Sequence, residues 1–123
     1  MRRVTLAVVV DVALIILFAA LGRRTHDEGS AVGGTLTVAA PFIIGYLIAA
    51  AALRLWRAPF SVRCAAPVWV AGIALGMVLR GTVFDRGLAP AFVVVAFVTT
   101  GALILGWRLV VARFAAASAD APG

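Results

Sequence analysis

The chain has 123 residues, of which 64% are hydrophobic and only 13% are charged, and its mean hydropathy is +1.13. A soluble globular protein is about half apolar and about a quarter charged, because its surface must be hydrated. The composition therefore excludes a soluble enzyme and predicts an integral membrane protein. The net charge of +6 comes from 11 basic residues, all arginine, and 5 acids. These arginines flank apolar segments, which indicates contacts with lipid phosphate and a role in topology, with no nucleic-acid partner.

Four apolar segments are long enough to cross a bilayer, at about 1.5 Å per helical residue and a hydrocarbon core of about 30 Å. They cover residues 4–21, 35–53, 67–84 and 90–107. The first segment is longer than the apolar core of a signal peptide, so we interpret it as an uncleaved first span. The sequence predicts an all-α, four-transmembrane-helix bundle in one domain, residues 1–114, with a flexible tail over 115–123. Pro67 and Pro90 are expected in the first turns of the third and fourth helices.

The arginines also predict an orientation, because positively charged residues stay on the cytoplasmic side of the cell membrane. With four spans, one side carries seven arginines: Arg2, Arg3, Arg54, Arg57, Arg63, Arg108 and Arg113. The other side carries four: Arg23, Arg24, Arg80 and Arg86. The difference favours cytoplasmic N- and C-termini, and it is small enough to leave a dual topology open.

Asp11 lies near the middle of the first predicted helix. An ionised carboxylate there costs about 2.5–3.5 kcal/mol, and the apolar neighbours offset this, so the helix can still insert. Counting depth in the antiparallel spans places Tyr46, Thr99 and Thr100 at the level of Asp11. We hypothesise a buried cluster of Asp11, Tyr46 and Thr99 or Thr100, because polar groups in lipid must find one another. The role of Asp11 is either to fix helix register or to couple protons or ions. Further alternatives are an oligomer contact and a simple excursion of the side chain to the cytoplasmic interface.

Arg80 is the second charge inside a span, about one turn from the outer end of the third helix. Its side chain either reaches the outer headgroups, caps the Thr37 carbonyl that Pro41 leaves without a helical donor, or leans toward Asp11. The connector between the first two spans gathers Arg23, Arg24, His26, Asp27 and Glu28. We interpret it as a solvated helix end, with an anion site around Arg23 and His26 as the alternative.

The sequence contains no pattern of catalytic, cofactor-binding or metal-ligating residues, and its single cysteine, Cys64, excludes a multi-cysteine zinc site. Small residues indicate close helix packing instead. Gly72 and Gly76 have GxxxG spacing, and Ala102 and Gly106 repeat the spacing of small residues. Pro41, Gly45 and Ala49 share one face of the second helix.

Several short motifs resemble a known family. They comprise Asp11, Phe18, Gly22–Arg23 with His26, Pro41–Phe42 with Gly45, Gly76 with Arg80, and Trp107–Arg108. This pattern is similar to that of the small four-span membrane proteins of domain-of-unknown-function family 3054, over nearly the whole chain. The resemblance implies the four-helix membrane fold and no assigned activity.

Three classes of function remain open at this point. The first is a structural or accessory membrane protein. Its expected partners are the lipid bilayer and either further copies of itself or another membrane protein. The second is a small oligomeric proton-coupled transporter or ion channel with Asp11 as the protonatable site. Small multidrug transporters share the size and an acid in the first helix, which is an analogy only. The third, a membrane enzyme, lacks a recognisable nucleophile, acid pair or cofactor ligand, so we expect the protein not to be an enzyme.

Overall fold

The computed structural model describes residues 2–23, 31–83 and 87–120. Within these residues the chain forms four long helices and one short 3-10 helix, without strands. The helices are α1 (Arg2–Arg23), α2 (Ala31–Ala52), α3 (Val62–Gly81) and α4 (Pro90–Asp120), and the 3-10 helix η1 spans Leu55–Arg57. All four long helices have the length and hydropathy of membrane spans. The structure therefore confirms the all-α, four-transmembrane-helix bundle that the sequence predicts.

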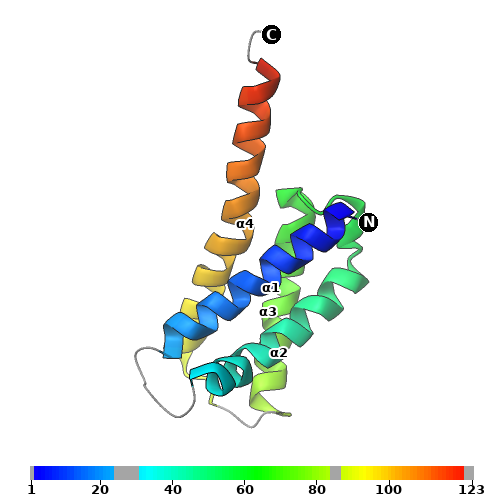
Figure 1. The fold of residues 1–123 in the computed structure, drawn as a ribbon. Coiled ribbons are helices and arrows are strands. Elements are labelled where there is room, and N and C mark those ends of the chain that lie inside the picture. The colour runs from blue at the N-terminus through cyan, green and yellow to red at the C-terminus, as the bar shows by residue number, and fades with distance from the viewer. Residues whose placement is uncertain (1, 24–30, 84–86, 121–123) are drawn as a thin grey trace.

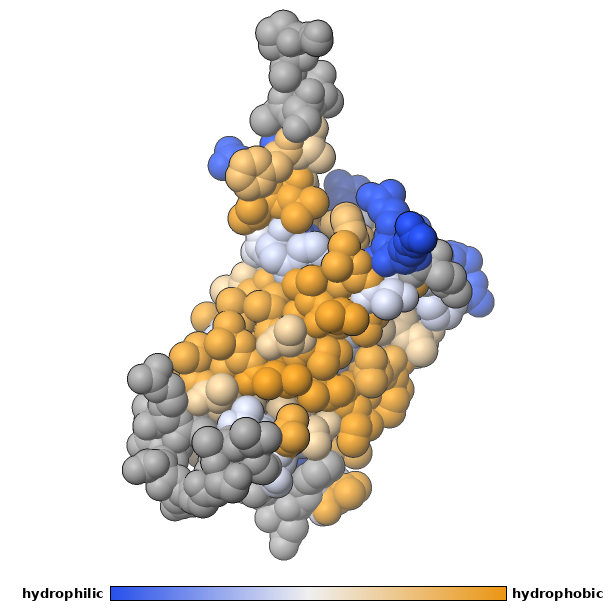
Figure 2. All heavy atoms as spheres, viewed as in Figure 1, coloured by the Kyte–Doolittle hydropathy of each residue, from blue (hydrophilic) through white to orange (hydrophobic). Residues whose placement is uncertain are grey.

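Each helix packs against two neighbours: α2 lies between α1 and α3, and α4 contacts both α1 and α3. In Figure 1 the first three helices form the body of the molecule, and the C-terminal part of α4 extends well beyond it. Most of the outer surface is apolar, and hydrophilic side chains gather at the end where the N-terminus lies (Figure 2). In a bilayer the lipid-facing surface and the core are both apolar. The core is therefore identified by contacts between helices and not by hydropathy.

Glycines allow α2 and α3 to approach closely. A Cβ atom added at Gly45 of α2 would lie 2.5 Å from the carbonyl oxygen of Gly72 and 2.7 Å from the amide nitrogen of Gly76. A Cβ added at Gly72 would lie 2.9 Å from the Cα of Tyr46. The GxxxG pair thus packs inside one bundle, against Gly45, and this contact fixes where the Tyr46 side chain begins. By contrast, Ala102 is exposed and nothing lies within 4 Å of a Cβ added at Gly106.

Two helix boundaries differ from those that the sequence predicts. Helix α3 begins at Val62 and not at Pro67, because Ser61 acts as its N-cap and accepts a hydrogen bond from the Cys64 amide at 3.4 Å. Pro67 therefore lies inside the helix, where its missing N–H removes one backbone hydrogen bond. At the other end, α4 continues to Asp120 through most of the segment expected to be a flexible tail. Alanine, the best helix former, dominates this segment, so propensity favours the longer helix.

The bundle interior has two layers along α1. Phe18 of α1, Phe42 of α2 and Phe92 of α4 form an aromatic cluster, with ring centroids 6.0–6.2 Å apart. Asp11 lies seven residues before Phe18, which is about 10 Å along the helix toward the N-terminus. The buried positions Ala7, Asp11, Ile15 and Phe18 follow the helical repeat, so α1 turns one face toward the other helices. The apolar layer therefore seals one side of a polar layer centred on Asp11.

Candidate functional site

Asp11 forms a salt bridge with Arg108 of α4, and both side chains are completely buried. The Nη1 atom of Arg108 donates to Oδ1 at 2.8 Å, and its Nη2 atom donates to Oδ2 at 2.7 Å. This bidentate arrangement is among the strong charge-assisted interactions between a carboxylate and a guanidinium. The pair joins the first span to the fourth, over 97 positions of sequence.

Two more donors complete the environment of the carboxylate. The indole Nε1 of Trp107 donates to Oδ1 at 2.8 Å, and the hydroxyl of Tyr46 donates to Oδ2. Each carboxylate oxygen thus accepts two hydrogen bonds, which fills its acceptor capacity. Helices α1, α2 and α4 therefore meet at this one carboxylate.

Arg108 also holds the connector between α2 and α3. Its Nε atom donates to the Pro59 carbonyl at 2.9 Å, and Nη1 makes a second bond to the Ile104 carbonyl at 2.8 Å. The chain reaches this position through Arg54, whose left-handed backbone (φ 57°) follows the end of α2. Four of the five N–H bonds of the guanidinium therefore have protein acceptors, and a charged group in an apolar interior requires this degree of pairing.

Aromatic rings cover the connector side of the ion pair. The Arg108 guanidinium carbon lies 4.5 Å from the Trp107 ring centroid, and Trp107 packs edge-on against Phe60 at 5.5 Å. The guanidinium of Arg3, on α1, lies over the other ring of this pair, 4.9 Å from the Phe60 centroid. These contacts place apolar surface and cation–π attraction between the buried pair and the end of the bundle.

The residues that sequence analysis grouped with Asp11 have different positions in the structure. Tyr46 bonds to Asp11, as described above, but no hydrogen bond from Thr99 or Thr100 to Asp11 occurs among the described residues. Thr100 accepts from Trp69 Nε1 at 3.1 Å and donates to the Ala96 carbonyl at 2.5 Å, so it ties α3 to α4 at another level. Thr99 is half-buried on α4.

The other candidate residues lie away from this site. Arg80 donates to the Gly87 carbonyl at 2.9 Å and places its guanidinium 4.1 Å from the Phe92 ring centroid, so it joins the end of α3 to the start of α4. It does not pair with Asp11. Arg23 is the last residue of α1, and its side chain is outside the described part of the structure, as is His26. Among the described residues, no group of three or more histidine, cysteine, aspartate or glutamate side chains is placed to hold a metal ion.

Sequence reasoning missed Arg108, which it counted as a charge flanking the fourth span. The depth count placed Thr100 level with Asp11, and the structure places Arg108 there, eight residues or about 12 Å further along α4. Figure 1 shows the reason: α1 runs obliquely to α4, and α4 continues past the bundle. One local signal was available, since the buried positions Ala96, Thr100, Ile104 and Arg108 recur every four residues on one face.

Comparisons with known proteins agree with this architecture. The family model described as a protein of unknown function (DUF3054) matches residues 8–111, a stretch that includes Asp11, Tyr46 and Arg108. No curated protein and no solved structure matches the chain. The family match confirms the resemblance that the sequence motifs indicate, and because it covers most of the chain, the protein belongs to domain-of-unknown-function family 3054.

Proposed function

We propose that this multi-pass membrane protein is a structural or accessory component of the cell membrane, and not an enzyme. The observation that carries the proposal is the fully paired Asp11 carboxylate, which accepts four hydrogen bonds from α2 and α4 while having no exposed surface. In this function the ion pair holds α1, α2, α4 and the α2–α3 connector in one arrangement. The bundle therefore presents a surface of fixed shape to the surrounding lipid.

Energetics favour a fixed pair over a proton carrier. Protonating Asp11 removes its negative charge, whereas the Arg108 guanidinium remains a cation. The buried guanidinium then lacks its counter-ion, and breaking a buried pair in this way costs about 3–5 kcal/mol. A carrier that released and rebound a proton at Asp11 would meet this cost in each cycle. A permanently formed structural ion pair has no such step.

The proposed surroundings follow from composition and charge. The lipid bilayer covers the apolar outer surface, and a homo-oligomer or a membrane-protein partner is the setting in which a structural component acts. We place the N- and C-termini in the cytoplasm. Arg108 is buried in the ion pair, so six arginines remain at the inner side, namely Arg2, Arg3, Arg54, Arg57, Arg63 and Arg113. They still outnumber the four assigned to the other side, and positive charge retained in the cytoplasm sets the orientation.

A flux experiment distinguishes a purely structural Asp11–Arg108 pair from a proton carrier. The purified protein is reconstituted into proteoliposomes with a pH gradient and, separately, with a membrane potential, and internal pH is followed with a fluorescent dye. We expect the parent protein to dissipate either gradient no faster than empty liposomes do. We expect Asp11→Asn to lower the thermal midpoint of the purified protein, with Arg113→Gln, an exposed arginine on the same helix as Arg108, as the unchanged control.

The opposite pattern would contradict the proposal. Proton flux in the parent that disappears in Asp11→Asn, at an unchanged thermal midpoint, would identify Asp11 as a transport residue. Measuring stability and flux on the same preparation keeps a folding defect from being read as lost transport.

A further inference from the structure

The end of the bundle where α1 begins has a concentration of positive charge. Its exposed arginines come from the start of α1, from the α2–α3 connector and from the first turn of α3: Arg2, Arg3, Arg54, Arg57 and Arg63. Figure 2 shows hydrophilic surface gathered at the end of the molecule where Figure 1 marks the N-terminus. Asp11, the single acidic residue of α1, is already paired with Arg108 and does not neutralise these arginines. The end therefore presents arginines to the bilayer interface, where lipid phosphates lie.

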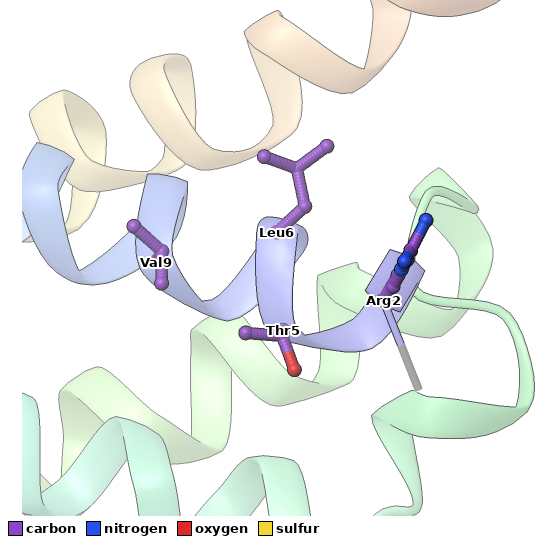
Figure 3. Close-up of a pocket in the computed structure, with 4 residues that line it drawn as sticks. All are labelled: Arg2, Thr5, Leu6 and Val9. Atoms are coloured by element: carbon purple, nitrogen blue, oxygen red, sulfur yellow. The ribbon is translucent and has the colours of Figure 1, made fainter.

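A shallow groove begins at this charged end and runs along α1. Its lining residues are Arg2, Thr5, Leu6 and Val9, and its volume is about 430 Å³. All four lining residues belong to α1, so the groove is an open hollow on one helix face and does not enclose a ligand. In Figure 3, Arg2, Leu6 and Val9 project from the same side of α1, and the ribbon of α4 passes alongside. Leu6 and Val9 are 55% and 58% exposed, so the apolar part of the groove is open to a ligand.

The lining changes from charged to apolar along the helix. Arg2 marks the headgroup end, Thr5 offers a hydroxyl one turn further on, and Leu6 and Val9 continue into the hydrocarbon region. From Arg2 to Val9 the helix rises about 10 Å, which spans the change from interface to acyl chains. A molecule that fits this gradient has an anionic head and an apolar tail, and it must reach the groove from the bilayer.

We propose that this groove binds an anionic phospholipid, with the phosphate on Arg2 and an acyl chain along Leu6 and Val9. The guanidinium matches the phosphate in charge and in its planar hydrogen-bond geometry, and it is less strongly hydrated than an ammonium group. Charge complementarity therefore selects the anionic headgroup, and the open apolar wall selects a lipid over a free anion. The inference does not rest on the proposed function, because none of the four lining residues takes part in the Asp11–Arg108 pair.

Native mass spectrometry of the purified protein in a neutral detergent tests the site. Phosphatidylglycerol and phosphatidylcholine with identical chains are titrated separately, and bound lipids are counted. We expect the parent protein to bind one phosphatidylglycerol more tightly than phosphatidylcholine. Arg2→Gln should weaken phosphatidylglycerol binding about fivefold, the contribution of one arginine near an anionic surface. Arg63→Gln, an exposed arginine outside the groove, should leave the affinity unchanged.

One more variant tests the apolar part of the groove, and three results would each contradict lipid binding there. Leu6→Ala combined with Val9→Ala should weaken binding of both lipids, because the acyl chain loses apolar contact area. Equal losses in Arg2→Gln and Arg63→Gln would show diffuse attraction to the charged end. Displacement of phosphatidylglycerol by inorganic phosphate would point to a free-anion site. A dimer that persists when lipid is removed and is lost in the Leu6 and Val9 variant would identify a second copy as the occupant.

Discussion

A double-mutant cycle on Asp11 and Arg108 measures how strongly the buried pair holds the helices together. Asp11→Asn keeps the shape of the side chain but removes its charge, so a neutral amide faces the Arg108 guanidinium. Arg108→Gln leaves the carboxylate with Tyr46 and Trp107 as its donors. We expect either change to lower the free energy of unfolding by about 3–5 kcal/mol, because one buried charge loses its partner.

The geometry predicts the orientation of the new amide in Asp11→Asn. Its oxygen can stay at the position of Oδ1, where Trp107 and Nη1 of Arg108 both donate. Its nitrogen then takes the position of Oδ2, where the Tyr46 hydroxyl can turn and accept, but Nη2 of Arg108 meets another donor. One charge-assisted hydrogen bond is therefore lost in addition to the charge, and such a bond contributes about 1.5–3 kcal/mol.

The double variant carries neither buried charge, so its loss should be smaller than the sum of the two single losses by about 1–3 kcal/mol. Unfolding in mixed micelles with increasing dodecyl sulfate, followed by tryptophan fluorescence, gives the four free energies. Arg113→Gln, an exposed position five residues beyond Arg108, should change stability by less than about 0.5 kcal/mol. Single losses that add within about 0.5 kcal/mol in the double variant would refute the reasoning, because additive losses indicate side chains that do not interact.

Two further outcomes test the packing and the topology. Gly45→Ala should lower the free energy of unfolding by about 1–3 kcal/mol in the same assay, because the added Cβ meets the α3 backbone at 2.5 Å. Gly106→Ala should leave it unchanged, because nothing lies within 4 Å of a Cβ added there. Equal effects of the two substitutions would contradict the close approach of α2 and α3. In a Cys64→Ser background, a membrane-impermeant maleimide added to intact cells should label Val83→Cys but should reach Ala115→Cys only after permeabilisation; labelling of Ala115→Cys in intact cells would reverse the proposed orientation.

Much of the fold could be predicted because it depends on local sequence. Runs of about 18 apolar residues must form helices in a bilayer, where every backbone polar group needs an internal partner. The family motifs coincide with packing sites: Phe18 and Phe42 belong to the aromatic cluster, and Gly45 and Gly76 lie at the contact of α2 with α3. The boundaries were less accurate, since a cap at Ser61 and the helix propensity of the last residues outweighed the proline and tail signals.

The candidate site was only partly accessible to sequence reasoning. The cost of a carboxylate in lipid identified Asp11 as a residue that needs partners, and depth counting found Tyr46, because α1 and α2 are joined by a short connector. The same counting failed for α4, whose depth relative to α1 depends on the angle between two helices separated by most of the chain.

The sequence by itself determined the number of spans, the helical class and the position of the buried acid, because each of these depends on hydropathy within one segment. Only the tertiary structure decided which cation neutralises that acid. Arg108 looks like a flanking charge when the fourth span is considered alone, and it becomes the partner of Asp11 only because α1 crosses α4 obliquely and α4 continues beyond the bundle. Helix angle and axial offset arise from side-chain packing between segments, and a single segment does not encode them.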